Sequence, residues 1–275
     1  MLWSVLLLMV VMTLRGLWPQ VRNLHWRTLA WLSASGLLIA CNWAIFIRAL
    51  QADRLVEASL GYFINPLVNA LLGVLFLRER LARTQRWALV AAAVGVGNEV
   101  FAVGVVPWMG LSLAVTFGLY GLVRKRIDVD PAVGLGVETV LMLPLALAFL
   151  ASHALSGAVD MLGLGLSGGA APLDHVDAGG LSELGLLALG GAVTVVPLMA
   201  FAGAARRLPL SSLGFFQYLA PSLSLMLAVL VYDEPFRLHQ LITFGAIWTG
   251  LVIFSIGALY DHGRTRARPT GGDAR

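Results

Sequence analysis

Long apolar runs alternate with short polar stretches along nearly the whole chain. A helix needs about 20 apolar residues to cross a hydrocarbon core about 30 Å thick. The runs lack the alternation of strands and exceed the roughly 10 residues of a membrane-barrel strand. The pattern therefore predicts an all-α, polytopic helix bundle. Its nine predicted transmembrane helices are residues 1–14, 28–50, 58–77, 87–106, 109–123, 132–150, 184–205, 210–231 and 240–260.

The basic residues between these runs test the map, because cytoplasmic loops of membrane proteins are rich in Lys and Arg. Sixteen of the nineteen basic residues follow the first, third, fifth and seventh runs or lie in the C-terminal tail. Only Arg48, Arg54 and Arg237 fall on the opposite side. This split predicts nine crossings, with the C-terminus in the cytoplasm and the N-terminus outside.

Composition supports a membrane location. The chain is 59% hydrophobic and 12% charged, whereas a soluble domain is about 25% charged. A soluble fold of this size could not hide so much apolar surface. The net charge of +4 comes from scattered arginines, so no nucleic acid partner is expected. The single cysteine, Cys41, excludes an intrachain disulfide. The glycine-rich loop 151–183 is expected to be flexible.

An internal repeat relates two of the predicted helices. Residues 59–63 (SLGYF) resemble residues 212–216 (SLGFF), and each stretch precedes a proline inside its helix, Pro66 and Pro221. Each proline is followed thirteen residues later by a glutamate. The two helices are five apart and cross in opposite directions, as in the inverted repeats of secondary transporters. A chance match of short apolar strings is the alternative.

The repeat divides the chain into two halves of unequal completeness. The first half, 1–106, lacks its opening helix, and the second half is 107–260. Residues 261–275 form a basic cytoplasmic tail that we expect to be disordered. The first run points to the same missing helix, because it gives only about 21 Å of helix and would start outside the cell.

The run EASLGYFINPLVN at residues 57–69 resembles the bacterial RarD proteins, in the EamA branch of the drug/metabolite transporter superfamily. Shorter stretches agree, at residues 42–43, 120–125, 138–139, 195–198 and 213–218. The resemblance covers nearly the whole chain. It implies ten inner-membrane helices in two inverted halves of five, with both termini in the cytoplasm. This sequence departs by starting at the second helix, which means a start assigned too late or a truncated gene.

Polar side chains in the middle of the third helix are candidates for solute binding. Tyr62, Asn65 and Asn69 have i, i+3 and i+7 spacing, so they share one face. Transporters of this kind bind solutes near the midplane, where helices are kinked or broken. Hydrogen bonds that only hold the bundle together are the alternative.

The eighth helix offers a matching face. Gln217 and Pro221 share it, with Tyr218 beside them, at places equivalent by the repeat to the face of the third helix. Asn42 and Trp43 could add an amide and an aromatic wall from the second helix. These residues and those of the third helix form the predicted solute cavity.

Four prolines lie inside predicted helices: Pro66, Pro144, Pro197 and Pro221. Proline frees a backbone carbonyl and bends a helix. Pro66, Pro197 and Pro221 are candidates for gating, and a simple packing kink is an equal alternative for each.

Glu138 is the candidate for proton coupling, because a buried glutamic acid that can release its proton could drive transport. A structural hydrogen bond to a neighbouring helix is the alternative. Glu99, beside Asn98, is a weaker candidate, since it lies nearer the outer surface. Ala91 with Gly95 indicates close helix packing, within the chain or in a homodimer.

These observations favour a secondary transporter over an enzyme. No zinc-binding histidine pair, nucleophile elbow or phosphate loop is found, and the only lysine is Lys125. We expect no cofactor and no metal, and as partners a small organic solute, lipid and a second copy. The resemblance implies export by alternating access. A channel, a membrane helper or sensor, and an inactive truncated permease are the alternatives.

Overall fold

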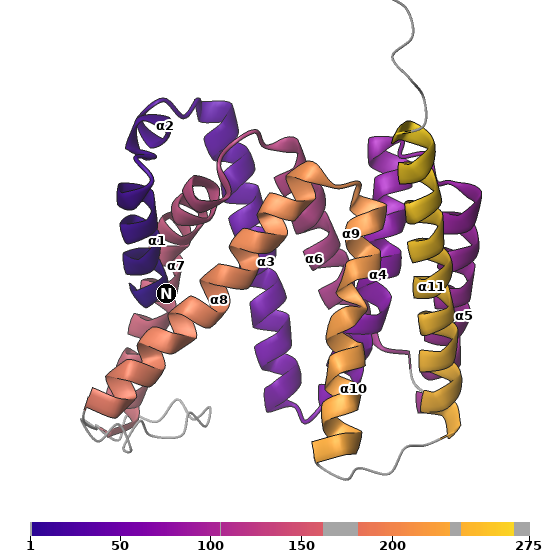
Figure 1. Cartoon of the computed structure of the whole chain (residues 1–275). Helices are drawn as coiled ribbons and strands as arrows, with labels where there is room; N and C mark the ends of the chain where they lie inside the picture. Colours follow the sequence, from indigo (N-terminus) through magenta and orange to yellow (C-terminus); the bar gives the residue numbers. More distant parts are fainter. Residues whose placement is uncertain (1, 105, 162–180, 232–237, 267–275) are drawn as a thin grey trace, which may run out of the picture. The chain divides into compact units, whose positions relative to one another are not determined.

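The computed structural model describes residues 2–104, 106–161, 181–231 and 238–266 (Figure 1). All regular structure within these ranges is helical, so the predicted all-α class is confirmed. The helices are α1 (Leu2–Leu14), α2 (Trp18–Arg22), α3 (Trp26–Gln51), α4 (Leu55–Leu77), α5 (Arg83–Val103), α6 (Trp108–Arg126), α7 (Pro131–Met161), α8 (Leu181–Arg207), α9 (Leu210–Gln217), α10 (Leu219–Val231) and α11 (Leu238–Arg266).

Each predicted span coincides with a helix, and the span 210–231 is divided into α9 and α10. Seven helices of the described part are long and apolar enough to cross a membrane, and α1 is a shorter apolar helix. The count of nine crossings therefore stays a prediction.

Two helices continue beyond the predicted ends. α7 runs to Met161, into the stretch predicted to be a flexible loop. α11 runs to Arg266, into the predicted tail. The apolar run ends before the helix does, because only the part of a helix inside the hydrocarbon core must be apolar. Polar and small residues can extend the helix beyond it. α8 already begins at Leu181, within the predicted loop, and residues 162–180 of the loop and 267–275 of the tail lie outside the described residues.

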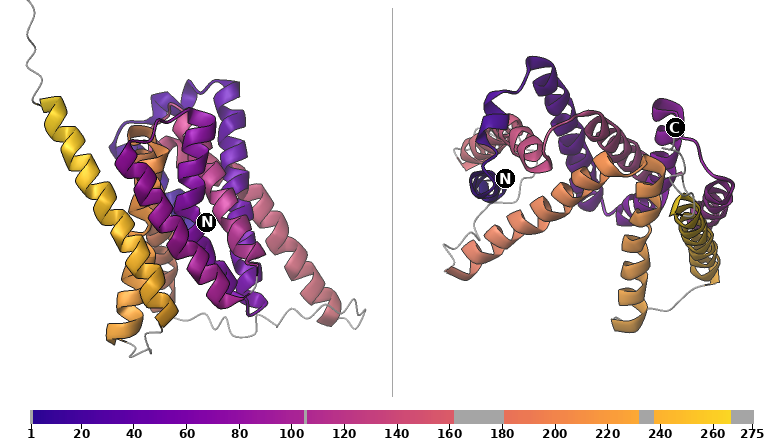
Figure 2. Two further views of the ribbon diagram at one scale, coloured as in Figure 1. Left: turned by 90° about the vertical axis from the view of Figure 1, so that its right-hand side faces the viewer. Right: turned by 45° about the horizontal axis from the view of Figure 1, so that its top comes forward.

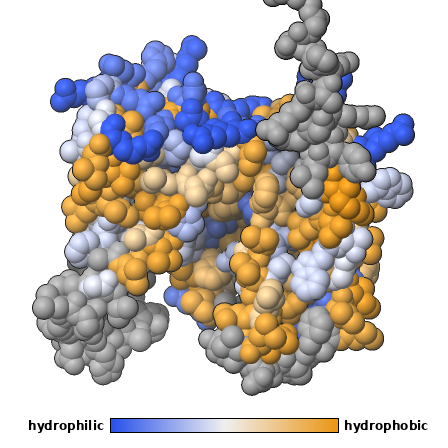
Figure 3. Space-filling view, in the orientation of Figure 1, coloured by the Kyte–Doolittle hydropathy of each residue, from blue (hydrophilic) through white to orange (hydrophobic). Residues whose placement is uncertain are grey.

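Large apolar side chains cover the outside of the helices (Figure 3). Phe101 is 87% exposed and Leu230 is 71% exposed. Hydrophilic side chains gather near helix ends in the same view. Such exposed apolar surface is costly in water and favourable in lipid. The protein is accordingly a multi-pass membrane protein.

The chain divides into two compact units. Unit 1 comprises Met1–Ala40 and Val123–Arg206, and unit 2 comprises Cys41–Leu122 and Arg207–Arg275. Helices α3 and α6 contribute residues to both units. Each unit therefore combines segments from both halves of the sequence. The repeat division at residue 106 concerns sequence similarity and stays a prediction.

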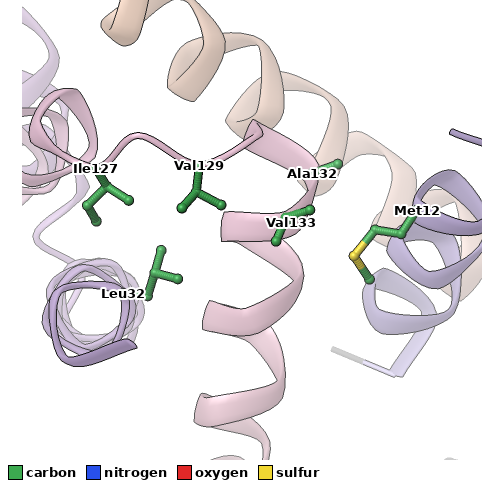
Figure 4. Close-up of a cluster of buried hydrophobic side chains, with 6 residues drawn as sticks. All are labelled: Met12, Leu32, Ile127, Val129, Ala132 and Val133. Atoms are coloured by element: carbon green, nitrogen blue, oxygen red, sulfur yellow. The ribbon is translucent and has the colours of Figure 1, made fainter. Parts of the chain in front are cut away.

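The core of unit 1 gathers around the connection from α6 to α7 (Figure 4). Two apolar residues of this connection, Ile127 and Val129, are buried with Leu32 of α3. Arg206 donates to the carbonyl of Val129 at 2.6 Å and also pairs with Asp128. The connection is thus held by packing and by charge, which fixes the start of α7.

The core of unit 2 depends on close helix contacts. A Cβ on Gly95 of α5 would lie 2.7 Å from the Thr243 carbonyl of α11, and one on Gly250 would lie 2.8 Å from the Ala88 carbonyl. Only glycine permits these approaches, so α5 and α11 run side by side (Figure 2). Gly95 therefore serves packing inside the chain.

Candidate functional site

Three amide side chains of unit 2 meet where α4 packs against α9. The Oε1 atom of Gln217 accepts hydrogen bonds from Asn69 Nδ2 at 2.7 Å and from Asn65 Nδ2 at 3.3 Å. We call Asn65, Asn69 and Gln217 the amide trio. Asn69 is fully buried, and the other two are partly buried. The structure thus brings together three residues that the sequence predicted to line one cavity.

The amide trio lies beside a break in the chain's eighth predicted span. α9 ends at Gln217 and α10 begins at Leu219. Pro221 has no N–H, so it cannot donate the helical hydrogen bond to the carbonyl of Gln217. The interruption is one residue long: Tyr218 keeps helical dihedral angles (φ −65°, ψ −13°), and the Ser222 N–H donates to the Tyr218 carbonyl at 3.2 Å. It therefore follows from the proline, and solute sites in transporters lie near interrupted helices.

Close backbone contact brings the two helices together at the trio. A Cβ on Gly214 of α9 would lie 2.6 Å from the carbonyl oxygen of Pro66 in α4. Glycine at 214 is therefore required for this approach. Pro66 is buried at this crossing, and α4 continues as one helix through it.

The start of α9 is tied to α4 by Glu79. Its carboxylate accepts hydrogen bonds from the backbone N–H of Leu210 at 2.7 Å and of Ser211 at 3.0 Å. The Ser211 hydroxyl donates to the same carboxylate at 2.8 Å. An acidic group is favourable at a helix N-terminus, where N–H groups lack partners. α9 is thus fixed at its first turn. Its last residue is Gln217, a member of the amide trio.

The two candidate tyrosines lie apart from the trio's hydrogen bonds. Tyr62 is 53% exposed. Tyr218 is 1% exposed and packs with Ala88 of α5 and Ile247 of α11. Its hydroxyl is buried without a hydrogen-bond partner in the described part of the chain. The helical spacing that suggested one shared face holds for Asn65 and Asn69 better than for Tyr62.

Asn42 and Trp43 also separate. Asn42 donates to the Leu113 carbonyl at 2.9 Å and to Thr116 Oγ1 at 2.8 Å, so it ties α3 to α6. Trp43 is 47% exposed. The hydrogen bonds of Asn42 are of the interhelical kind that holds membrane bundles together.

Glu138 lies in a buried polar cluster of unit 1. Its Oε1 atom accepts hydrogen bonds from the Ser35 hydroxyl and from Arg124 Nη1, the latter at 3.2 Å. The three residues are 2%, 0% and 1% exposed, for Glu138, Ser35 and Arg124 respectively. Glu138 Oε2 and Arg124 Nε are buried without a partner among the described residues. The cluster is a buried ion pair with unused hydrogen-bonding capacity.

Arg124 was missed as a functional residue, because by sequence it is one of several basic residues after the fifth span. The structure instead lays its guanidinium across Gly134, where any Cβ would overlap it. A glycine one helical turn before a buried glutamate is the only sequence signal for this arrangement. The positive charge of Arg124 therefore serves Glu138 inside the protein.

Glu99 belongs to a contact between α5 and α11. Thr243 Oγ1 donates to Glu99 Oε2 at 2.7 Å, and Asn98 Nδ2 donates to the His239 carbonyl at 2.9 Å. The His239 Nε2 atom lies 3.8 Å from Glu99 Oε1. This carboxylate has its partners within one helix pair.

The remaining prolines differ in burial. Pro221 is buried near the break, whereas Pro144 in α7 and Pro197 in α8 are exposed within helices that continue through them. No group of three metal-ligating side chains is found among the described residues. Unit 2 offers hydrogen bonding by amides, and unit 1 separately offers charge pairing.

Apolar helices, a helix interrupted beside hydrogen-bonded amides, and a buried ion pair are features found in multi-pass membrane transporters. An uncharacterised transporter of Vibrio cholerae is 45% identical over 270 residues, covering 97% of this chain and 84% of the relative. Protein RarD of Salmonella typhimurium is 40% identical, covering 94% of this chain and 84% of its own length. The chain belongs to the RarD family.

A more distant relative, chloramphenicol-sensitive protein RarD of Pseudomonas aeruginosa, is 30% identical, covering 91% of this chain and 80% of the relative. No family model matches the chain. A crystal structure with 20% sequence identity has a TM-score of 0.62, covering 94% of this chain and 85% of that one. At this identity the likeness shows the fold alone. Of these three relatives, the one from Vibrio cholerae is named a transporter.

Proposed function

We propose that this protein is a secondary transporter that exports a small organic solute by alternating access. The observation that carries the proposal is the break between α9 and α10, with Gln217 at its edge hydrogen-bonded to Asn65 and Asn69. Polar groups inside a membrane are expensive and are kept where they bind or couple. A proline inside a helix leaves one carbonyl without its helical donor and bends the helix at the same place.

We further propose that Glu138 couples transport to protons. When ionised, the carboxylate is compensated by Arg124 at 3.2 Å. A proton on Glu138 would break this compensation and free the Arg124 guanidinium for other partners. Two charge states of one buried pair would thus favour two arrangements of the helices that carry them. The ion pair also fits a purely structural role. The pH dependence of transport distinguishes that role from proton coupling.

The distribution of basic residues supports a proposal about location. We place the protein in the bacterial inner membrane, with the C-terminus in the cytoplasm, from the distribution of basic residues. We also propose that the protein has the EamA-type fold of two inverted five-helix halves, and that it forms a homodimer.

The experiment uses purified full-length protein in liposomes loaded with solute, with an imposed proton gradient. Chloramphenicol is the first probe, because the name of the Pseudomonas aeruginosa relative mentions it. Solute flux that follows the proton gradient supports the proposal. A fast leak that ignores the gradient would indicate a channel. No flux of any solute in a broad panel, together with a stable partner recovered from membranes, would indicate a helper protein and contradict transport.

A further inference from the structure

The amide trio has unused hydrogen-bonding capacity. Gln217 Oε1 serves both asparagines, and the Oδ1 atoms of Asn65 and Asn69 are buried without a donor in the described part of the chain. A buried polar atom left unpaired costs about 1–3 kcal/mol. A ligand that donates hydrogen bonds here would recover that cost. Rotating the amides exchanges donors for acceptors, so the trio can meet a solute with either kind of group.

No charge accompanies the trio along its own helices. In α4, the residues between Glu57 and Arg78 include no Asp, Glu, His, Lys or Arg, and the stretch of α9 and α10 from Leu210 to Val231 includes none either. Glu79 is occupied at the far end of α9. An ionised group far from water needs an opposite charge, and without one its burial is strongly unfavourable. The trio is therefore unsuited to a charged ligand.

We infer that the amide trio recognises an uncharged solute through a group with both a donor and an acceptor, such as a primary amide or a hydroxyl. A carboxamide can accept from an asparagine Nδ2 and donate to an asparagine Oδ1 at once, as the amides already do with each other. This inference rests on the proposed transport function and specifies the charge class of the substrate. It assigns selection against charged solutes to the lack of any counter-charge on α9 and on the part of α4 between Glu57 and Arg78.

The isosteric change Gln217→Glu tests the assignment. A carboxylate at this place keeps both acceptor sites for Asn65 and Asn69 but adds a negative charge at the centre of the trio. We expect exchange of neutral solutes to fall at least tenfold, and exchange of ammonium solutes to appear. Gln51→Glu, the same change at the exposed end of α3, is the matched control and should leave the solute preference unchanged.

The experiment is counterflow into liposomes that hold the purified protein. The solutes are an equimolar mixture of matched size in three charge classes: uncharged amides and polyols, carboxylates, and ammonium compounds, each quantified by mass spectrometry. The unmodified protein decides the charge class by itself, so the inference is tested even if Gln217→Glu fails to fold. Preferential exchange of the uncharged class, lost in Gln217→Glu and kept in Gln51→Glu, supports it.

Two other outcomes overturn it in distinguishable ways. Preferential exchange of carboxylates or ammonium compounds by the unmodified protein overturns the neutral-solute assignment and leaves transport standing. No exchange of any class by correctly inserted protein overturns the proposed function, and this inference with it.

Discussion

At the residue scale, Glu138 and Arg124 stabilise each other, because both charges are buried and hydrogen-bonded together. Breaking a buried ion pair by removing one partner costs about 3–5 kcal/mol, since the remaining charge is left uncompensated. We expect Arg124→Gln and Glu138→Gln each to lower the unfolding temperature in detergent. The double variant should recover most of that loss. Additive losses in the double variant would show that the pair has no energetic coupling.

The same double variant separates structure from coupling. With glutamine at both positions the cluster is neutral and cannot exchange a proton. We therefore expect it to be inserted and folded but to show no response of transport to an imposed pH gradient. The measurement is solute flux in liposomes with and without the gradient. Flux that still follows the gradient would assign the pair a structural role only.

Gly134 tests the position of Arg124 independently. Any Cβ at this residue overlaps the guanidinium, so Gly134→Ala should displace Arg124 and lower the unfolding temperature. The control is Gly97→Ala in α5, where, apart from the adjoining residues and the helix's own backbone, no described atom lies within 4 Å of the added carbon. Alanine normally stabilises a helix by about 1 kcal/mol over glycine, so the control should be neutral or more stable. Equal effects at both glycines would contradict the placement of Arg124.

At the element scale, α9 depends on the cap that Glu79 supplies. Losing an N-terminal capping side chain costs about 0.5–2 kcal/mol. Because Glu79 accepts three hydrogen bonds from the first turn of α9, we expect Glu79→Ala to fall at the upper end of that range. Ser211→Ala, which removes one of the three, should cost less. Thermal unfolding of the two variants in the same detergent compares them, and a larger effect of Ser211→Ala would contradict this ranking.

The break between α9 and α10 gives a prediction about motion. Pro221→Ala restores an N–H that can donate to the Gln217 carbonyl, so the two helices can join. We expect slower transport with unchanged or higher thermal stability, as when a hinge is stiffened. Pro144→Ala, at an exposed proline in α7, is the control. Unchanged transport rates in Pro221→Ala would assign the proline to packing alone.

Sequence and structure agree best on elements and least on contacts. Apolar runs predicted where helices lie, because lipid requires about 20 apolar residues per crossing. Apolarity alone does not show the interruption at Tyr218, since residues on both sides are equally apolar, and Pro221 is the residue that predicted a bend there. Spacing and repeat predicted that Asn65, Asn69 and Gln217 line one cavity from two helices; the structure joins them by direct hydrogen bonds, and their role in solute binding stays a prediction. The partner of Glu138 was not, because the basic-loop pattern gave Arg124 another explanation.

At the scale of the whole molecule, the distribution of basic residues predicts which side of the membrane each loop faces. Replacing the single cysteine, Cys41, by serine gives a background for new cysteines. We expect an impermeant thiol reagent to label Ala52→Cys on intact cells, because the predicted topology places that residue, which follows α3, on the outer side. Gln20→Cys and Gly271→Cys should react only after the membrane is opened.

An epitope fused to the N-terminus completes this test. Nine crossings place it outside the cell, because the first helix then runs inward to the arginines that follow it. α1 has 13 residues, about 20 Å of helix, which is shorter than the hydrocarbon core of a bilayer. Its crossing is therefore the one that this test examines. An epitope reached only after permeabilisation, with Ala52→Cys still labelled from outside, would mean that α1 stays on the cytoplasmic side and that the chain crosses eight times. Either result fixes the direction of α4 and α9, and so the side of the membrane from which Glu79 and the amide trio are approached.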